Sequence, residues 1–263
     1  METQLMQLAG RTVLVTGGRR VGGKLARLLA QRGANIALSY HRNREAVEET
    51  ARDCQQAGVR AEIFQADLRE ADQAQRLIDQ TVARFGSVDV LINLTSIYTR
   101  TPWNELTPQD YDAMIASNLT APYWTAIAAA RQMQRQPIVA GIQGKIIHFT
   151  DWSVDRPYRG FLPYLVAKGG LVTLTKALAV ELAPTILVNA IAPGTIEPPP
   201  DLSQEQLERI RQSAALERIG SADDVNQAVL YLLEGTDFVT GEVFRVDGGR
   251  FLGPSGESQA DGE

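Results

Sequence analysis

The stretch that decides the fold is TVLVTGGRRVGG, residues 12–23. Its first five residues predict a buried strand, while Leu25, Leu28 and Leu29 lie at helical spacing just beyond it. The glycines between them let the backbone turn sharply and approach a dinucleotide pyrophosphate, whose oxygens the first helical N–H groups can bind. The alternative is a turn that is rich in glycine only for packing. The predicted phosphate-binding residues are Gly17, Arg19, Arg20, Val21 and Gly23.

The same alternation of strand and helix runs outward along most of the chain. It is typical of parallel strands joined by right-handed crossovers, with helices on both faces. Strands are expected at residues 12–16, 35–40, 61–65, 88–93, 145–149, 186–191 and 243–246. Helices are expected at residues 21–32, 45–57, 70–85, from 107 onward, 164–182, 203–213 and 222–234.

The predicted fold class is therefore α/β. We expect a single Rossmann-type doubly wound domain, with about seven parallel strands flanked by helices, over residues 1–252. Residues 253–263 are small, polar and acidic, which predicts a disordered tail.

The composition excludes several classes of protein. A net charge of −5 with 44% hydrophobic residues fits an ordinary globular domain and predicts no nucleic-acid partner. The lone Cys54 excludes an intrachain disulfide, and the start of the chain does not resemble a signal peptide, so we expect a cytoplasmic protein. We expect no membrane span and no metal, because long apolar runs and metal-ligand spacing are both missing from the sequence.

Basic residues follow the second expected strand, where an NAD-specific site would carry an acid for the ribose hydroxyls. His41, Arg42 and Asn43 stand there instead, and a guanidinium binds a phosphate well, so NADPH/NADP+ is the predicted cofactor. The alternative is a solvated helix start. After the third strand, Asp67 with Leu68 can bind the adenine amine, or Asp67 can cap the next helix.

Tyr164 and Lys168 lie four residues apart at the start of an expected helix, so their side chains share a face. A free tyrosine is a poor acid–base group at neutral pH, and a neighbouring ammonium favours its phenolate. This pair predicts a proton donor for the atom that becomes negative when a hydride arrives.

The glycine turn and the Tyr164/Lys168 pair together resemble the short-chain dehydrogenase/reductase family over about residues 10–250. The resemblance implies that Asn118 holds a water of a proton relay and that Asn93 supports the sheet beside the cofactor. It also implies a turn that contacts the nicotinamide, formed by Pro193, Gly194 and Thr195.

Two departures from the family pattern point to one of its branches. Val21 replaces the middle glycine of the turn, and Asp151 stands where the family carries its catalytic serine. Pteridine reductases also carry an aspartate there, and Tyr98 falls where they place an aromatic that stacks on the pterin. Leu94, Thr95 and Arg100 depart from their pattern, and Asp151 can instead be a drifted serine position.

The leading hypothesis is therefore an NADPH-dependent reductase of a dihydropterin C=N bond. Its catalytic residues would be Asp151, Tyr164, Lys168 and Asn118, with Tyr98, Asp151 and Tyr164 at the substrate. The alternatives are a carbonyl or 3-oxoacyl-carrier-protein reductase and, in another class, a non-catalytic NADP(H)-binding sensor. We expect a homotetramer, as in related enzymes. We also expect packing roles for His148 and for Trp103, Trp124 and Trp152.

Overall fold

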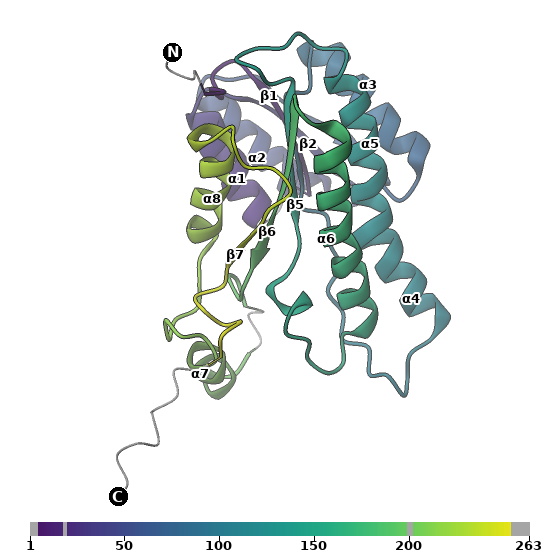
Figure 1. Cartoon of the computed structure of the whole chain (residues 1–263), viewed down its shortest axis with the longest axis vertical. Helices are drawn as coiled ribbons and strands as arrows, with labels where there is room; N and C mark the ends of the chain where they lie inside the picture. Colours follow the sequence, from purple (N-terminus) through teal and green to yellow (C-terminus); the bar gives the residue numbers. More distant parts are fainter. Residues whose placement is uncertain (1–4, 18–19, 199–201, 254–263) are drawn as a thin grey trace, which may run out of the picture.

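Seven parallel strands form one sheet at the centre of the molecule (Figure 1). This computed structural model describes residues 5–17, 20–198 and 202–253. The strand order is β3-β2-β1-β4-β5-β6-β7, and it reverses between β1 and β4, so a ligand crevice is expected there. The strands are β1 (Thr12–Thr16), β2 (Asn35–Tyr40), β3 (Ala61–Gln65), β4 (Val90–Asn93), β5 (Gly144–Phe149), β6 (Ile186–Pro193) and β7 (Val243–Val246). The predicted fold class is confirmed.

Helices cover both faces of the sheet (Figure 1). One core contains Val13 and Val15 of β1 with α1, α2 and α8, and the other contains Leu14 with α3, α5 and α6. Successive strand residues point to opposite faces, so β1 alone supplies both cores. The helices are α1 (Val21–Gln31), α2 (Arg44–Gln56), α3 (Ala71–Phe85), α4 (Pro108–Ile115), α5 (Ala121–Met133), α6 (Leu162–Leu182), α7 (Gln204–Gln212) and α8 (Ala222–Leu230).

The helix expected after residue 107 begins as predicted. Thr107 caps it, and Asp110 returns a bond to the Thr107 N–H at 3.0 Å. A π-helical turn, η1 (Ala116–Thr120), joins α4 to α5, and Asn118 lies in it, buried. Such turns are frequent at functional sites, because the extra residue re-aims a side chain.

Several expected boundaries were wrong. The helix predicted to run to residue 234 changes at Tyr231 into a π-helical turn, η3 (Tyr231–Gly235), and the strand predicted to end at Ile191 continues to Pro193. Trp103 is 81% exposed and Trp124 37%, so their predicted packing roles were wrong, whereas Trp152 is buried. Gly253, the first residue of the expected tail, is buried, and residues 254–263 lie outside the described part of the chain.

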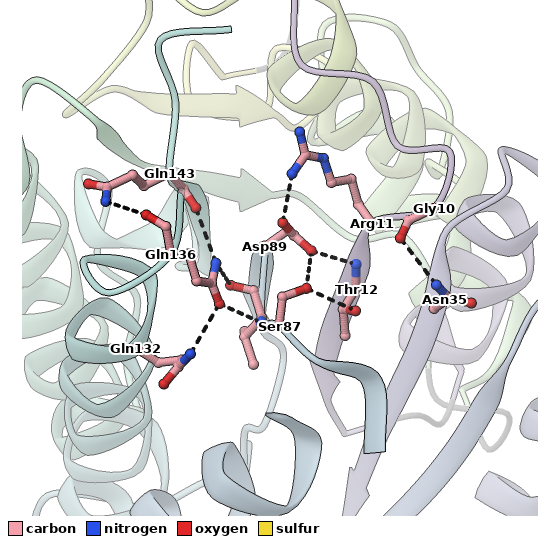
Figure 2. Close-up of polar contacts among 10 residues, drawn as sticks. Gly10, Arg11, Thr12, Asn35, Ser87, Asp89, Gln132, Gln136 and Gln143 are labelled. Atoms are coloured by element: carbon pink, nitrogen blue, oxygen red, sulfur yellow. Dashed lines mark hydrogen bonds and ion pairs between the residues drawn. The ribbon is translucent and has the colours of Figure 1, made fainter. Parts of the chain in front are cut away.

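A buried polar network lies at the amino ends of the strands (Figure 2). The Asp89 carboxylate accepts hydrogen bonds from the Thr12 N–H at 2.8 Å, Ser87 Oγ at 2.7 Å and Arg11 Nη1 at 2.9 Å. Gln136 of the segment after α5 binds the backbone of Val88 in both directions. The network joins β1 to β4, at the edge opposite to the predicted site.

No helix within residues 5–17, 20–198 and 202–253 has both the length and the apolar character that crossing a membrane requires.

Candidate active site

The turn after β1 requires glycine at two positions. Gly17 has a φ of +79°, which favours glycine, and a Cβ on Gly22 would lie 2.3 Å from the Gly17 carbonyl oxygen. Gly23 and Val21 lie in the first turn of α1, where Gly23 is buried. The first backbone N–H groups of a helix have no acceptor within the helix and can bind a phosphate, so this turn fits a dinucleotide. The predicted contact Arg19 lies outside the described residues.

Arg20 and Lys24 place positive charge beside this turn. Arg20 Nε lies 3.2 Å and Lys24 Nζ 3.0 Å from the carboxylate of Glu197, in the segment after β6. Arg20 also donates a hydrogen bond to the Glu197 carbonyl oxygen at 2.5 Å. The glycine turn after β1 and the segment after β6 therefore face each other at the carboxyl edge of the sheet.

The ends of β2 and β3 form the other part of the expected cofactor site. His41 Nε2 lies 3.6 Å from Asp67 Oδ2, and Arg69 Nε donates to Asp67 Oδ1 at 2.8 Å. These hydrogen bonds from Arg69 lower the pKa of Asp67 to about 2, so it is a carboxylate at neutral pH. Arg42 is exposed. Sequence reasoning missed Arg69, whose role depends on the turn that Asp67 begins.

Two residues predicted here have structural roles as well. The Asn43 side chain accepts from the Ala46 N–H at 3.3 Å and caps α2. Leu68 is buried in the core. The alternative role of Asp67 as a helix cap was wrong, because Glu70 stands at the N-cap of α3.

The predicted catalytic groups converge at the carboxyl end of β5. The Tyr164 hydroxyl donates to Asp151 Oδ2 at 2.8 Å, and Lys168 Nζ lies 5.7 Å from the centre of the Tyr164 ring. Lys168 Nζ also donates to the Phe149 carbonyl oxygen at 2.7 Å. Tyr164 is 5% and Lys168 3% exposed, so both groups work in a low-dielectric environment.

Burial controls the protonation of this pair. It raises the pKa of Tyr164 above its usual value, and the neighbouring Asp151 carboxylate raises it further. Burial lowers the pKa of Lys168 to about 8. Tyr164 therefore holds its proton at neutral pH, as an acid for a reduction must.

Asp151 is held by its own short helix. It caps the 3₁₀ turn η2 (Trp152–Val154), and its Oδ1 accepts from the Ser153 N–H at 2.9 Å and from Ser153 Oγ at 2.5 Å. The nearest serine to the family position therefore binds the aspartate rather than replacing it. One carboxylate bridges Ser153 and Tyr164.

Two asparagines organise the ends of β4 and of α4. Asn118 Oδ1 accepts from the Ile97 N–H at 2.9 Å, and its amide donates to the Ile97 carbonyl oxygen at 2.9 Å. Asn93 Nδ2 lies 3.3 Å from Nδ1 of His148. His148 is fully buried, and burial with the nearby Lys168 lowers its pKa to about 3, so its expected packing role is confirmed.

An aromatic cluster lies beside Tyr164, and its Tyr98 ring contacts the Tyr164 ring. The Tyr98 ring stacks on Phe161, with centroids 4.4 Å apart, and meets the Tyr164 ring edge-on at 5.0 Å. The Tyr98 and Tyr158 hydroxyls are 2.8 Å apart. The Tyr98 ring therefore lies beside the Tyr164 ring. Tyr158 and Phe161 were missed, because nothing local marks them.

The turn after β6 lies next to the turn after β7. Gly194 donates to the Val246 carbonyl oxygen at 2.9 Å, and a Cβ on Gly194 would lie 2.7 Å from Asp247 Cα. Pro193 ends β6, and Thr195 Oγ1 accepts a hydrogen bond from Arg250. A cavity of about 470 Å³ opens beside Gly194 and Thr195, along residues 245–249.

No cluster of metal-ligating side chains occurs in the described ranges 5–17, 20–198 and 202–253.

Comparisons with known proteins agree with this arrangement. The model of a family described as "Enoyl-(Acyl carrier protein) reductase" matches residues 17–250. The uncharacterized oxidoreductase YohF of Escherichia coli is 32% identical over 249 residues, which cover 93% of this chain and 97% of YohF. The 3-oxoacyl-[acyl-carrier-protein] reductase FabG of Staphylococcus aureus is also 32% identical over 249 residues, 92% of this chain and 98% of FabG.

Solved structures give the same result. A short-chain dehydrogenase/reductase from Serratia marcescens matches with a TM-score of 0.85 and 30% identity, over 93% of this chain and 99% of that one. A dehydrogenase/reductase from Sinorhizobium meliloti matches with a TM-score of 0.85 and 33% identity, over 93% and 96%. On this sequence, fold and site geometry, the chain belongs to the short-chain dehydrogenase/reductase family of oxidoreductases, which bind a nicotinamide cofactor.

Proposed function

We propose that this protein is an NADPH-dependent reductase that acts on the C=N bond of a flat nitrogen heterocycle of the dihydropterin class. The observation that carries the proposal is the 2.8 Å hydrogen bond from the Tyr164 hydroxyl to Asp151. A carboxylate in this position accepts N–H groups, whereas a serine would donate to a carbonyl oxygen. Asp151 uses only part of its acceptor capacity on Tyr164 and Ser153.

The reaction adds two hydrogens across the double bond. The reduced nicotinamide, when bound, supplies a hydride, and this adds to the carbon of the C=N bond. The Tyr164 hydroxyl gives its proton to the nitrogen, and Lys168 stabilises the phenolate that remains. The raised pKa of Tyr164 keeps the donor protonated until the nitrogen becomes basic.

The chain's residues fit a phosphorylated dinucleotide. Gly17 and Gly22 leave the turn open, and Arg20 and Lys24 add positive charge beside it. At the end of β2, residues 41–44 are His, Arg, Asn and Arg, so no acid meets the ribose there. Arg42 is the proposed partner of the 2′-phosphate, because a guanidinium can bind it through two hydrogen bonds.

A second candidate is a 3-oxoacyl thioester reductase. It is supported by the 32% identity to FabG of Staphylococcus aureus over nearly the whole chain. Asp151 separates the two candidates, because a serine-like donor suits a ketone and an acceptor suits a ring N–H.

The test is an absorbance assay of NADPH and NADH oxidation with dihydrobiopterin, dihydromonapterin and a 3-oxoacyl thioester. We expect turnover of a pterin with NADPH, a loss of at least about 100-fold in Tyr164→Phe, and a shift towards the ketone in Asp151→Ser. Turnover of the thioester alone would favour the second candidate. Tight NADPH binding without any turnover would favour a non-catalytic sensor.

A further inference from the structure

Arg250 is a half-buried cation near the proposed catalytic groups, and the mechanism proposed above does not use it. It lies in the turn after β7, and its guanidinium carbon is 4.6 Å from the centre of the Trp152 ring. One of its nitrogens, Nη1, donates to Thr195 Oγ1. Its Nε is buried, and among the described residues it has no hydrogen-bond partner.

The carboxylates around Arg250 are bound to other donors. Asp247 accepts from the Gly249 N–H at 2.9 Å and the Phe251 N–H at 2.7 Å. Asp155 Oδ2 lies 2.5 Å from Arg245 Nη2, and Asp151 accepts hydrogen bonds from Tyr164 and Ser153. Within the part of the chain that the structure describes, no carboxylate oxygen lies within 4.0 Å of the Arg250 guanidinium. Burying such a charge without an anion costs stability.

The turn that carries Arg250 is held firmly in place. Arg156 Nη1 donates to the Arg250 carbonyl oxygen at 2.8 Å, and the Arg245 guanidinium covers the Phe251 ring at 3.9 Å. Gly249 has a φ of +78°, and a Cβ there would lie 2.8 Å from Ala215 Cβ. The backbone is therefore fixed so that the guanidinium reaches back over Trp152, towards the residues at the substrate.

The electrostatic neighbours of Arg250 belong to the substrate side of the site. Burial lowers the pKa of its guanidinium, and Tyr158, Tyr98 and Asp151 act in the opposite direction. Tyr98 and Asp151 flank Tyr164. The turn at the expected pyrophosphate has its own cations, Arg20 and Lys24.

We propose that Arg250 binds a carboxylate of the substrate, so that the enzyme selects an acid over its neutral analogue. This rests on the proposed function in one respect, that the substrate is reduced at Tyr164. Arg250 keeps part of its surface exposed, and an edge of a guanidinium presents its N–H groups as a planar fork that matches the two oxygens of a carboxylate. The substrate's charge then supplies the anion that the protein itself lacks at this place.

The test compares substrates that differ only in a carboxylate, in the holoenzyme. The kinetic pairs are 6-carboxy-7,8-dihydropterin against dihydrobiopterin, and acetoacetate against ethyl acetoacetate. We expect the acid to have at least about a tenfold higher kcat/KM in the wild type, and Arg250→Gln to lower that value by about 10- to 100-fold. The neutral analogue should change by less than about threefold, and Arg250→Lys should restore part of the loss, because it keeps the charge and loses the fork.

A binding measurement separates this proposal from the proposed function. Calorimetric titration of the protein–NADP+ complex with pterin-6-carboxylate and with pterin needs no turnover. We expect tighter binding of the acid by at least about tenfold, and loss of that preference in Arg250→Gln. If the wild type turns over no pterin yet keeps the preference, the reaction is wrong and the anion site stands.

Controls identify the other roles that Arg250 could have. Arg76→Gln, an identical change on the exposed surface of α3, should alter neither substrate preference nor melting temperature. Arg250→Gln should keep or raise the melting temperature, since it removes an uncompensated charge. If Arg250→Gln lowers kcat/KM equally for the acid and the neutral substrate, the proposal is overturned. A raised KM for NADPH in that variant would then assign Arg250 to the cofactor diphosphate. A lowered melting temperature would assign it to folding.

Discussion

At the scale of single residues, this site differs from a serine-based one because a negative charge lies beside Tyr164, the proposed proton donor. Asp151 places a carboxylate oxygen 2.8 Å from the Tyr164 hydroxyl, where it raises the tyrosine pKa and opposes Lys168. The hydrogen bond from Lys168 Nζ to the Phe149 carbonyl oxygen offsets part of the free-energy cost of burying the ammonium. The consequence is a tyrosine that donates protons readily only to a strongly basic atom, such as the nitrogen formed by hydride addition.

We expect Lys168 to set the upper pH limit of the proposed reaction. Its pKa is lowered to about 8, so the ammonium is present below that pH and is lost as the pH rises through it. Because reduction consumes a proton and Lys168 stabilises the phenolate, we expect kcat/KM to fall by about tenfold per pH unit above about pH 8. Arginine stays protonated over this range, so we expect Lys168→Arg to have a lower kcat/KM that does not fall between pH 7 and 10. A wild-type profile that stays flat to pH 10 contradicts this role.

At the scale of elements, two irregular segments place the functional groups. The turn between β1 and α1 is so tight that a Cβ on Gly22 would lie 2.3 Å from the Gly17 carbonyl oxygen, whereas Val21 begins α1 and packs against the core. The π-helical turn η1 directs Asn118 at the backbone of Ile97, in the segment that carries Tyr98. Both segments interrupt regular structure at the carboxyl edge of the sheet, where ligands bind in this architecture.

Gly22→Ala should damage cofactor binding before it damages chemistry. The new Cβ would lie 2.3 Å from the Gly17 oxygen, so the turn must open and its N–H groups move. We expect KM for NADPH to rise at least about tenfold in steady-state assays, with a smaller change in kcat. Gly169→Ala in α6 is the matched control, because the added Cβ would meet only Val154 Cγ1, at an ordinary contact distance of 3.9 Å. An unchanged KM in Gly22→Ala would refute the assignment of this turn.

At the scale of the whole molecule, the two edges of the sheet have separate tasks. The carboxyl edge carries the turns and the proposed catalytic groups, while the amino edge carries the Asp89 network (Figure 2). A second buried polar contact joins β5 to the segment after α8: Lys145 Nζ lies 2.5 Å from Asp237 and donates to the carbonyl oxygens of Leu232 and Leu233. Stability can therefore change without direct damage to the site.

Asp89→Ala tests this separation. It removes the partner of Ser87 Oγ and leaves the Thr12 N–H and the Arg11 guanidinium without their acceptor. We expect a loss of about 2–4 kcal/mol in the free energy of unfolding by urea, with kcat per folded molecule unchanged. The control Asp79→Ala, at an exposed position of α3, should lower the free energy of unfolding by no more than about 0.5 kcal/mol. A loss of kcat in folded Asp89→Ala protein would show that the two edges are coupled.

The sequence by itself determined the elements of the fold and proposed much of the candidate site. The apolar strands, the glycine turn, the capping box at Thr107 and the Tyr164/Lys168 spacing are local patterns, because each depends on residues within a few positions of one another. Parallel topology follows from the alternation of strand and helix, which also brings the strand ends to one edge. The convergence of Asp151 with Tyr164 was predictable through the family resemblance.

Only the tertiary structure decided which distant residues complete the site. Tyr158 meets Tyr98 from 60 positions away, and Arg250 meets Thr195 from 55, with no local signal for either contact. The exposure of Trp103 and the burial of Lys145 were equally hidden. The physical reason is that burial and charge compensation depend on packing between elements, and a side chain's partners are chosen by the folded arrangement rather than by its neighbours in the chain.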